Sequence, residues 1–283
     1  MRLPDFLIIG AMKSGTTTLF FDLAKHPNIF LPNEKEPHDL CSDQVLNRRG
    51  MKRYASLFRK AKTDQICGEA STGYTKLPTY TDVPERAVQV LGANTKLIYI
   101  VRDPIVRSLS HHRFMYQQGK MPASFLMALK HCPEIVDYSK YAYQIEAWQQ
   151  VFSPKNIKVI IFEQYINNRP TELQSVMRFL QLPIIETPLT PPKNVTEQIA
   201  VPTWPIDRFI NTPIYRRGIK NFFPQPWRDW TKNKLFQKTT KRPVAVETES
   251  RALLEALLTD DIQRFSNLFP YLDLSLWGLS ANL

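Results

Sequence analysis

The stretch Asp5-Phe-Leu-Ile-Ile-Gly-Ala-Met-Lys-Ser-Gly-Thr-Thr-Thr-Leu-Phe20 decides the fold of this chain. Its apolar run, residues 6–9, predicts a buried strand, and the residues from Gly10 to Gly15 predict a tight turn. The hydroxyl residues after Gly15 open an apolar-periodic segment, which predicts a helix. A strand, a glycine-bounded turn and a helix N-terminus together form a cradle for an anion, because free backbone N–H groups and the positive end of the helix dipole point at the ligand.

The side chains of this turn strengthen the prediction of an anion site. The predicted anion-binding residues are Lys13, Ser14, Gly15, Thr16, Thr17 and Thr18. The alternative is an ordinary strand-to-helix turn with a polar cap. The order of residues departs from the G-x-x-x-x-G-K-[ST] pattern, because Thr16 stands at the lysine position and Lys13 comes earlier. The turn therefore suits a phosphate-like group but differs from the Mg-ATP pattern.

Length and composition favour a single α/β domain. The chain has 283 residues, of which 43% are hydrophobic, enough for a substantial core. Asp5 interrupts the first apolar stretch, and no run approaches the ~18 apolar residues of a membrane span, so we expect neither a signal peptide nor a transmembrane segment. The three cysteines are scattered, which argues against a disulfide framework or a zinc site. The expected location is cytoplasmic.

Short apolar strands alternate with helical segments along the chain. This alternation predicts a parallel sheet flanked by helices, joined by right-handed crossovers. After the first strand, further strands are predicted at 29–31, 65–69, 96–101 and 157–162. Helices are predicted at 17–25, 48–60, 84–91, 104–118, 138–152, 170–180 and 247–269.

Proline-rich stretches after residue 182 mark a long irregular region. We therefore predict one domain over residues 1–283, with a core at 1–182 and an irregular lid or acceptor-binding region with a closing helix at 183–283. Much of the net charge of +11 is local, since residues 208–242 carry ten basic residues and one acid, interleaved with aromatics. Such a segment is typical of binding to nucleic acid, an anionic membrane or an anionic small ligand, or of a solvated basic face. We favour a lid over an anionic ligand and expect no nucleic-acid partner.

A second group of polar residues follows the strand predicted at 96–101. Arg102 comes directly after that strand, and Ser110 lies about two helical turns further on. In a parallel sheet the carboxyl ends of the strands face one ligand crevice, so we expect Arg102 to reach the same crevice as Lys13. Arginine is suited to bidentate phosphate binding, although a structural ion pair is the alternative. Together the two motifs predict two anion sites, one at each end of a nucleotide.

Lys13-Ser-Gly-Thr-Thr17, followed by Ile100-Val-Arg-Asp-Pro104 and Ser110, resembles the sulfotransferases that use 3′-phosphoadenosine 5′-phosphosulfate (PAPS). The resemblance covers the first two thirds of the chain in motif order and spacing. It implies a P-loop-like central parallel sheet whose first loop holds the 5′-phosphosulfate, while Arg102 and Ser110 hold the 3′-phosphate. It also implies that Lys193 closes over that 3′-phosphate, with a solvated loop lysine as the alternative.

The segment Asn33-Glu-Lys-Glu-Pro-His38 is similar to the heparan-sulfate branch of this family and its bacterial relatives. In that branch the Glu is the catalytic base, which implies Glu36 here, and His38 is the rival base because a neutral imidazole does the same work. Two departures stand out. Asp39-Leu40 replaces the usual aromatics, and the later Glu-Lys-Thr/Ser segment appears as Glu69-Ala-Ser71 without the lysine. The family's acceptor contacts are therefore not carried over.

The resemblance implies transfer of a sulfuryl group from PAPS to a hydroxyl or amine of a small-molecule acceptor in specialised metabolism. Glu36 takes the acceptor's proton, and Lys13 stabilises charge on the leaving phosphate oxygen, an effect of ~3–4 kcal/mol for a good donor. This chemistry requires no metal, and the sequence shows no convincing metal-ligand spacing. Two alternatives stay open. One is a P-loop nucleotide or small-molecule kinase with Asp103 as a magnesium ligand, and the other is non-enzymatic binding to nucleic acid or membrane through residues 208–242.

Overall fold

The fold is built on a five-stranded, wholly parallel sheet with the strand order β2-β3-β1-β4-β5. The structure is a computed structural model, and it describes residues 1–186, 189 and 248–278. The strands are β1 (Phe6–Gly10), β2 (Ile29–Phe30), β3 (Ile66–Ala70), β4 (Lys96–Val101) and β5 (Ile157–Ile161). The predicted parallel sheet is confirmed, and the apolar runs fixed the strands to within a few residues.

Alternate residues of each central strand point to opposite faces of the sheet and into two separate cores. In β1, Leu7 and Ile9 belong to the core on one face, whereas Phe6 and Ile8 belong to the core on the other. Because both faces are covered, the strand is apolar throughout and every residue from Phe6 to Gly10 is buried. The continuous apolar run, with no alternation of polar residues, is therefore the expected signature of a central parallel strand.

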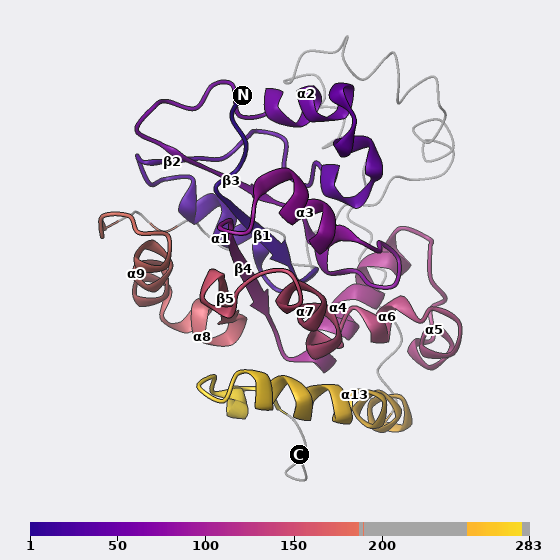
Figure 1. Cartoon of the computed structure of the whole chain (residues 1–283). Coiled ribbons are helices and arrows are strands. Elements are labelled where there is room, and N and C mark those ends of the chain that lie inside the picture. The colour runs from indigo at the N-terminus through magenta and orange to yellow at the C-terminus, as the bar shows by residue number, and fades with distance from the viewer. Residues whose placement is uncertain (187–188, 190–247, 279–283) are drawn as a thin grey trace, which may run out of the picture.

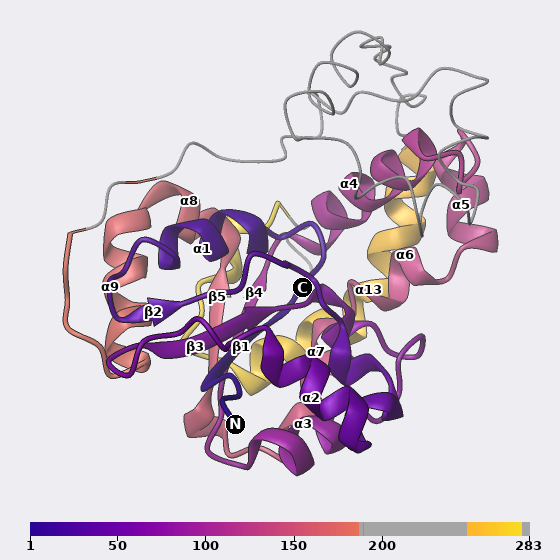
Figure 2. The same cartoon turned by 90° about the horizontal axis from the view of Figure 1, so that it is seen from above.

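Helices cover both faces of the sheet, as Figure 2 shows. On one face lie α1 (Thr16–Leu23), α8 (Phe162–Asn167) and α9 (Arg169–Phe179). The opposite face is covered mainly by α2 (Arg48–Ser56), α3 (Val83–Leu91), α7 (Tyr141–Gln149) and α13 (Thr248–Leu268). The helices α4 (Pro104–Gln117), α5 (Phe125–His131) and α6 (Glu134–Asp137) form the crossover between β4 and α7 (Figure 1).

Two of the predicted helices differ from the structure by three or more residues at an end, and the others by one or two. The helix expected at 138–152 begins at Tyr141, because Lys140 at its N-cap is not helical and the short α6 precedes it. The helix expected at 48–60 ends at Ser56. The closing helix at 247–269 is confirmed as α13, whereas the lid predicted within residues 183–283 falls largely outside the described residues.

The strand order places one crevice at the centre of the sheet. The chain moves from β1 to β2 and β3 on one side of β1, and then returns to add β4 and β5 on the other side. This reversal makes the carboxyl ends of β1 and β4 a topological switch point, where ligands of open α/β sheets bind. The turn after β1 and Arg102 after β4 are the two motifs found in the sequence, and the fold places them on adjacent strands.

Candidate active site

The turn after β1 has the backbone conformation of an anion-binding loop. Lys13 and Gly15 both have positive φ angles, 70° and 88°. The backbone N–H groups of Gly15, Thr16 and Thr17 have no hydrogen-bond partner in the part of the chain that the structure describes, and the first turn of α1 contains no acidic residue. Successive unpaired N–H groups at a helix N-terminus form a concave, positively polarised surface. The predicted cradle is therefore present in the structure.

Gly15 is required at its position by space as well as by conformation. A Cβ atom there lies 2.5 Å from the ring of Phe162, and φ = 88° is a strained angle for any other residue. Phe162 is the first residue of α8 and follows β5 directly. No local pattern of residues signals this contact, because it joins residues almost 150 positions apart.

Lys13 projects from the turn into a cationic environment. Its Nζ lies 4.7 Å from the centroid of the Phe114 ring. Burial lowers the pKa of Lys13, and the positive charges of Arg102 and Arg107 lower it further. Of the other predicted residues in the loop, Ser14, Thr16 and Thr18 are buried and Thr17 is half-buried. A group of cations that repel one another is the electrostatic environment expected for an anionic ligand.

Arg102 lies at the carboxyl end of β4, and Phe162 and Glu163 lie beside its guanidinium. The guanidinium carbon lies 4.8 Å from the centroid of the Phe162 ring, and Nε lies 3.8 Å from Oε1 of Glu163. The backbone carbonyl of Arg102 accepts a hydrogen bond from the Tyr141 hydroxyl at 2.7 Å. Ser110 is half-buried on α4. Arg102 thus follows β4 and Ser110 lies on α4, so both belong to the strand-to-helix unit next to the Lys13 turn, as predicted.

Asp103, the magnesium ligand of the kinase alternative, has a structural role instead. Its Oδ1 accepts hydrogen bonds from the backbone N–H groups of Ile105 (2.8 Å) and Val106 (3.1 Å), which caps α4. Its Oδ2 accepts a hydrogen bond from the N–H of Gly278 at 3.2 Å. Both oxygens are occupied and the residue is buried, so the geometry gives no support to a metal ligand.

Glu36 reaches the same edge of the sheet from the loop after β2. Its backbone N–H donates to the carbonyl of Ala70 at 3.0 Å, at the carboxyl end of β3, and β3 pairs with β1. Oε1 lies 2.5 Å from Nζ of Lys35, and Oε2 accepts from the N–H and the hydroxyl of Thr72, at 2.7 and 3.0 Å. Burial acts to raise the pKa of Glu36, but Lys35 and Thr72 outweigh it and hold the pKa below its usual range.

His38 lies beside Glu36, with Nε2 3.5 Å from Oε2 of Glu36. Burial lowers the pKa of His38, which keeps the imidazole neutral at pH 7. The backbone N–H of His38 donates to Oγ of Ser71 at 3.1 Å, and a Cβ on Gly73 meets Nδ1 at 2.5 Å. The structure therefore brings the two candidate bases together and places them at the end of β3, one strand from the Lys13 turn.

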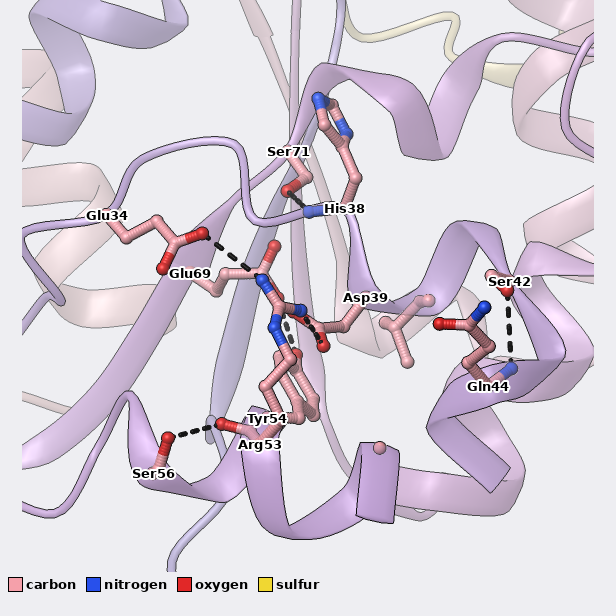
Figure 3. Close-up of polar contacts among 12 residues, drawn as sticks. Glu34, His38, Asp39, Ser42, Gln44, Arg53, Tyr54, Ser56, Glu69 and Ser71 are labelled. Atoms are coloured by element: carbon pink, nitrogen blue, oxygen red, sulfur yellow. Dashed lines mark hydrogen bonds and ion pairs between the residues drawn. The ribbon is translucent and has the colours of Figure 1, made fainter. Parts of the chain in front are cut away.

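Glu69, the first residue of the Glu69-Ala-Ser71 segment, is a buried carboxyl group next to this loop. Glu69 is fully buried on β3, and its Oε2 accepts hydrogen bonds from the hydroxyls of Tyr54 (2.5 Å) and Tyr74 (3.0 Å). Burial raises the pKa of Glu69 to about 7. Figure 3 shows this group beneath the segment that carries His38 and Asp39, where Arg53 links Asp39 to Glu34. The sequence marks Glu69 as part of the Glu69-Ala-Ser71 segment and as an acid in an otherwise apolar strand, but not as the partner of two tyrosines.

Arg107 is a second functional candidate that sequence reasoning did not single out. It is fully buried on α4, and its guanidinium donates to Oγ of Ser139 at 2.5 Å and to the carbonyl of Ile135 at 2.6 Å. No carboxylate lies within 4 Å of it among the residues that the structure describes. A buried guanidinium without an acid adds to the positive potential around Lys13.

Two further expectations lie outside the described residues. Lys193 and the basic segment 208–242 both fall in the range 190–247, so the structure describes neither. Within the described residues, no group of three or more His, Cys, Asp or Glu side chains is arranged to hold a metal ion. None of the helices in that part of the chain is long and apolar enough to cross a membrane.

Comparison with known proteins identifies the family to which the chain belongs. Residues 3–198 match the family described as "Sulfotransferase domain". Among curated proteins, "Heparan sulfate glucosamine 3-O-sulfotransferase 6" of Homo sapiens is 28% identical over 198 residues, which cover 66% of this chain and 54% of that protein. "Membrane-associated sulfotransferase kil1" of Dictyostelium discoideum is 37% identical over 120 residues, which cover 41% of this chain and 24% of that protein. The chain thus spans about half or less of the length of these relatives.

A solved structure extends the comparison to almost the whole fold. The sulfotransferase from Alicyclobacillus acidocaldarius superposes with a TM-score of 0.67 at 20% sequence identity, covering 98% of this chain and 99% of that one. The match confirms the predicted P-loop-like sheet architecture, and the curated relatives confirm the similarity to the heparan-sulfate branch. The chain is therefore an enzyme of the sulfotransferase family, as its resemblance to the PAPS-dependent sulfotransferases implied.

Proposed function

We propose that this enzyme transfers the sulfuryl group of PAPS to a hydroxyl or amine of an acceptor, without a metal. The observation that carries the proposal is the convergence of three strand ends: the Lys13 turn after β1, Arg102 after β4, and Glu36 held against the end of β3. The first two supply positive charge at separate points, and the third supplies a carboxylate. PAPS carries two anionic groups and a transferable sulfuryl group, which matches this arrangement.

The residues of the crevice fit both anionic ends of the donor. Unpaired N–H groups of residues 15–17 and the ammonium of Lys13 suit the 5′-phosphosulfate. The guanidinium of Arg102, stacked on Phe162, and the hydroxyl of Ser110 suit the 3′-phosphate. Lys193 remains a proposed third contact for that phosphate.

Glu36 is the proposed base. The ion pair with Lys35 keeps the carboxylate ionised at neutral pH, and its contacts with Thr72 fix its orientation. The same contacts lower its basicity, which leaves His38 as the rival: an imidazole that burial keeps neutral, with Nε2 3.5 Å from Oε2 of Glu36. The lone pair of the acceptor oxygen or nitrogen forms a bond to sulfur while the bond from sulfur to the phosphate oxygen breaks. The acceptor's proton passes to the base, and Lys13 neutralises the charge on the departing phosphate oxygen.

The nature of the acceptor stays a prediction, as do the cytoplasmic location and the single-domain organisation over residues 1–283. We expect a small molecule, whereas the names of the human relatives specify heparan sulfate. The experiment therefore incubates the full chain with radiolabelled PAPS and two acceptor panels, one of small alcohols and amines and one of heparan oligosaccharides. Transfer to the first panel supports the proposal, and transfer to the second alone overturns the small-molecule prediction. Absence of PAPS binding by calorimetry overturns the donor assignment.

A further inference from the structure

Lys76 is a half-buried lysine that the proposed mechanism does not use. It follows the short 3₁₀ turn Thr72–Thr75 at the end of β3, and its Nζ lies 5.7 Å from the centroid of the Tyr138 ring. Among the residues that the structure describes, no carboxylate lies within 4 Å of this ammonium group. Removing an ammonium group from water without an ion pair is costly, so such a position needs a reason.

The backbone on both sides of Lys76 is held in place. Oγ1 of Thr75 donates to the carbonyl of Ile9 at 3.0 Å, which ties the turn to the end of β1 directly before the Lys13 loop. The N–H of Leu77 donates to Oε1 of Gln144 at 2.8 Å, and the carbonyl of Leu77 accepts from Nε2 of Gln144 at 2.9 Å. The backbone that carries Lys76 is therefore fixed. This lowers the conformational entropy that is lost when a ligand binds to its side chain.

The turn that ends at Lys76 joins the proposed base to the donor loop, because Thr72 donates to Oε2 of Glu36 and Thr75 donates to the carbonyl of Ile9. Burial lowers the pKa of Lys76, Glu36 raises it, and Arg107 and Lys35 lower it further. The Tyr138 ring, which the Lys76 ammonium overlies, stacks on His111 at 5.7 Å, and the Phe114 ring under the Lys13 ammonium lies three residues further along α4. Both ammonium groups therefore lie against the same side of α4. Glu36 is the acid whose charge reaches Lys76, and Glu36 is itself paired with Lys35. The local balance is positive, and an anionic group of a ligand restores it.

We propose that Lys76 binds the sulfuryl oxygens of the donor from the acceptor side, opposite Lys13. The inference rests on the proposed function, because it takes PAPS as the donor. The sulfuryl group has to lie between the loop that holds the 5′-phosphate and the base that faces the acceptor. Lys76 directly follows the turn Thr72–Thr75, which is hydrogen-bonded to both. During transfer, its ammonium donates hydrogen bonds to the oxygens of the sulfuryl group as the bond to the phosphate oxygen breaks and the bond to the acceptor forms.

Calorimetry with two ligands separates this role from a structural one. PAPS and adenosine 3′,5′-bisphosphate differ only in the sulfuryl group, so the ratio of their Kd values isolates contacts to that group. For Lys76→Met we expect PAPS to bind about tenfold more weakly and the bisphosphate to bind as it does to the wild type, as for loss of one charge-assisted hydrogen bond. Lys76→Arg keeps the charge and is expected to restore most of the ratio.

Lys96→Met is the matched control. Lys96 also has its ammonium over an aromatic ring, 5.2 Å from the centroid of Phe179, and donates to Asn156 at 2.9 Å, but it lies at the amino end of β4, away from the crevice. For this variant, the ratio of the Kd values for PAPS and the bisphosphate is expected to equal that of the wild type. An unchanged ratio in Lys76→Met overturns the proposal. So does loss of bisphosphate binding in both Lys76→Met and Lys76→Gln, which assigns Lys76 a structural role. A wild-type chain that binds neither ligand refutes the proposed function itself.

Discussion

The guanidinium carbon of Arg102 lies 4.8 Å from the centroid of the Phe162 ring, and the same ring lies against the turn at Gly15, where an added Cβ would meet it at 2.5 Å. Phe162 therefore touches both halves of the proposed donor site. It does so because β5 ends beside β4, so that the first residue of α8 lies next to the ends of β4 and β1. A residue with no recognisable motif thus sets the spacing between two motifs that the sequence does reveal.

Phe162→Leu is expected to weaken binding of adenosine 3′,5′-bisphosphate by roughly threefold to tenfold. The stacked guanidinium loses a cation–π contact of about 0.5–2 kcal/mol, and Arg102 gains freedom before the ligand binds. Phe162→Tyr keeps the aromatic face and should bind like the wild type. Calorimetry checks both variants, and equal affinity of the leucine variant and the wild type contradicts a positioning role for Phe162.

Gly15→Ala is expected to lower bisphosphate affinity by at least tenfold, because the added Cβ meets Phe162 at 2.5 Å and φ = 88° is strained for alanine. Gly119→Ala is the matched control. Gly119 also has a positive φ of 69°, but a Cβ there meets no atom within 4 Å. The two variants share the backbone strain and differ in the clash at the loop. Equal binding by both variants shows that the loop does not hold the ligand.

Arg102→Ala is expected to reduce affinity for the 3′-phosphorylated donor product far more than affinity for its 3′-dephospho analogue, adenosine 5′-monophosphate. The expected difference is at least tenfold, since a charge-assisted contact to phosphate contributes about 1.5–3 kcal/mol. Titration of both ligands into the same protein preparation measures it. Equal weakening of the two ligands removes Arg102 from the 3′-phosphate site.

Glu36→Gln is expected to lower the transfer rate at least a hundredfold while leaving donor affinity within about twofold of the wild type. The amide keeps the contacts with Thr72 but accepts no proton. His38→Asn tests the rival base in the same assay. If Glu36→Gln stays active and His38→Asn loses the rate, the imidazole is the base and the carboxylate only orients it.

Glu69→Gln is expected to change how stability depends on pH. Burial raises the pKa of Glu69 to about 7 in the folded protein, above its value in the unfolded chain. The folded state therefore retains a proton that the unfolded state loses, and the free energy of unfolding falls as pH rises from about 4.5 to 7. The variant lacks this dependence, so its stability relative to the wild type should rise by about 3 kcal/mol over that window and then level off. Urea denaturation at steps from pH 4.5 to 8 measures the difference, and a pH-independent difference contradicts the assignment.

The sheet was predictable from sequence because its central strands are continuous apolar runs bounded by turn residues. The helices α5 and α8 were not predicted. The apolar part of α5 is too short to show a period, and α8 begins directly at the end of β5 with no turn residue to mark the change. Helix boundaries shifted where the backbone leaves the helical region, as at Lys140 before α7, whose ψ is 81°.

The candidate site was predictable where it is local in sequence. Lys13 and Gly15 lie in one turn, and Arg102 follows a strand whose direction fixes where it points. Phe162, Glu69 and Lys76 carried no such signal, because their environments come from the strand order and from burial. Glu69 looks like an interruption of an apolar strand until Tyr54 and Tyr74 are seen to donate to it. Lys76 looks like a turn lysine until the structure shows it half-buried, with no carboxylate within 4 Å of its ammonium among the described residues.

The most direct measurement is a crystal structure of the full chain soaked with adenosine 3′,5′-bisphosphate. The central claim predicts the 5′-phosphate on the N–H groups of residues 15–17 beside Lys13, and the 3′-phosphate at Arg102 and Ser110. It also predicts that the 5′-phosphate faces Glu36 across a gap wide enough for a sulfuryl group and an acceptor oxygen. Density for the nucleotide at any other place on the protein, or a soaked crystal without it, contradicts the claim.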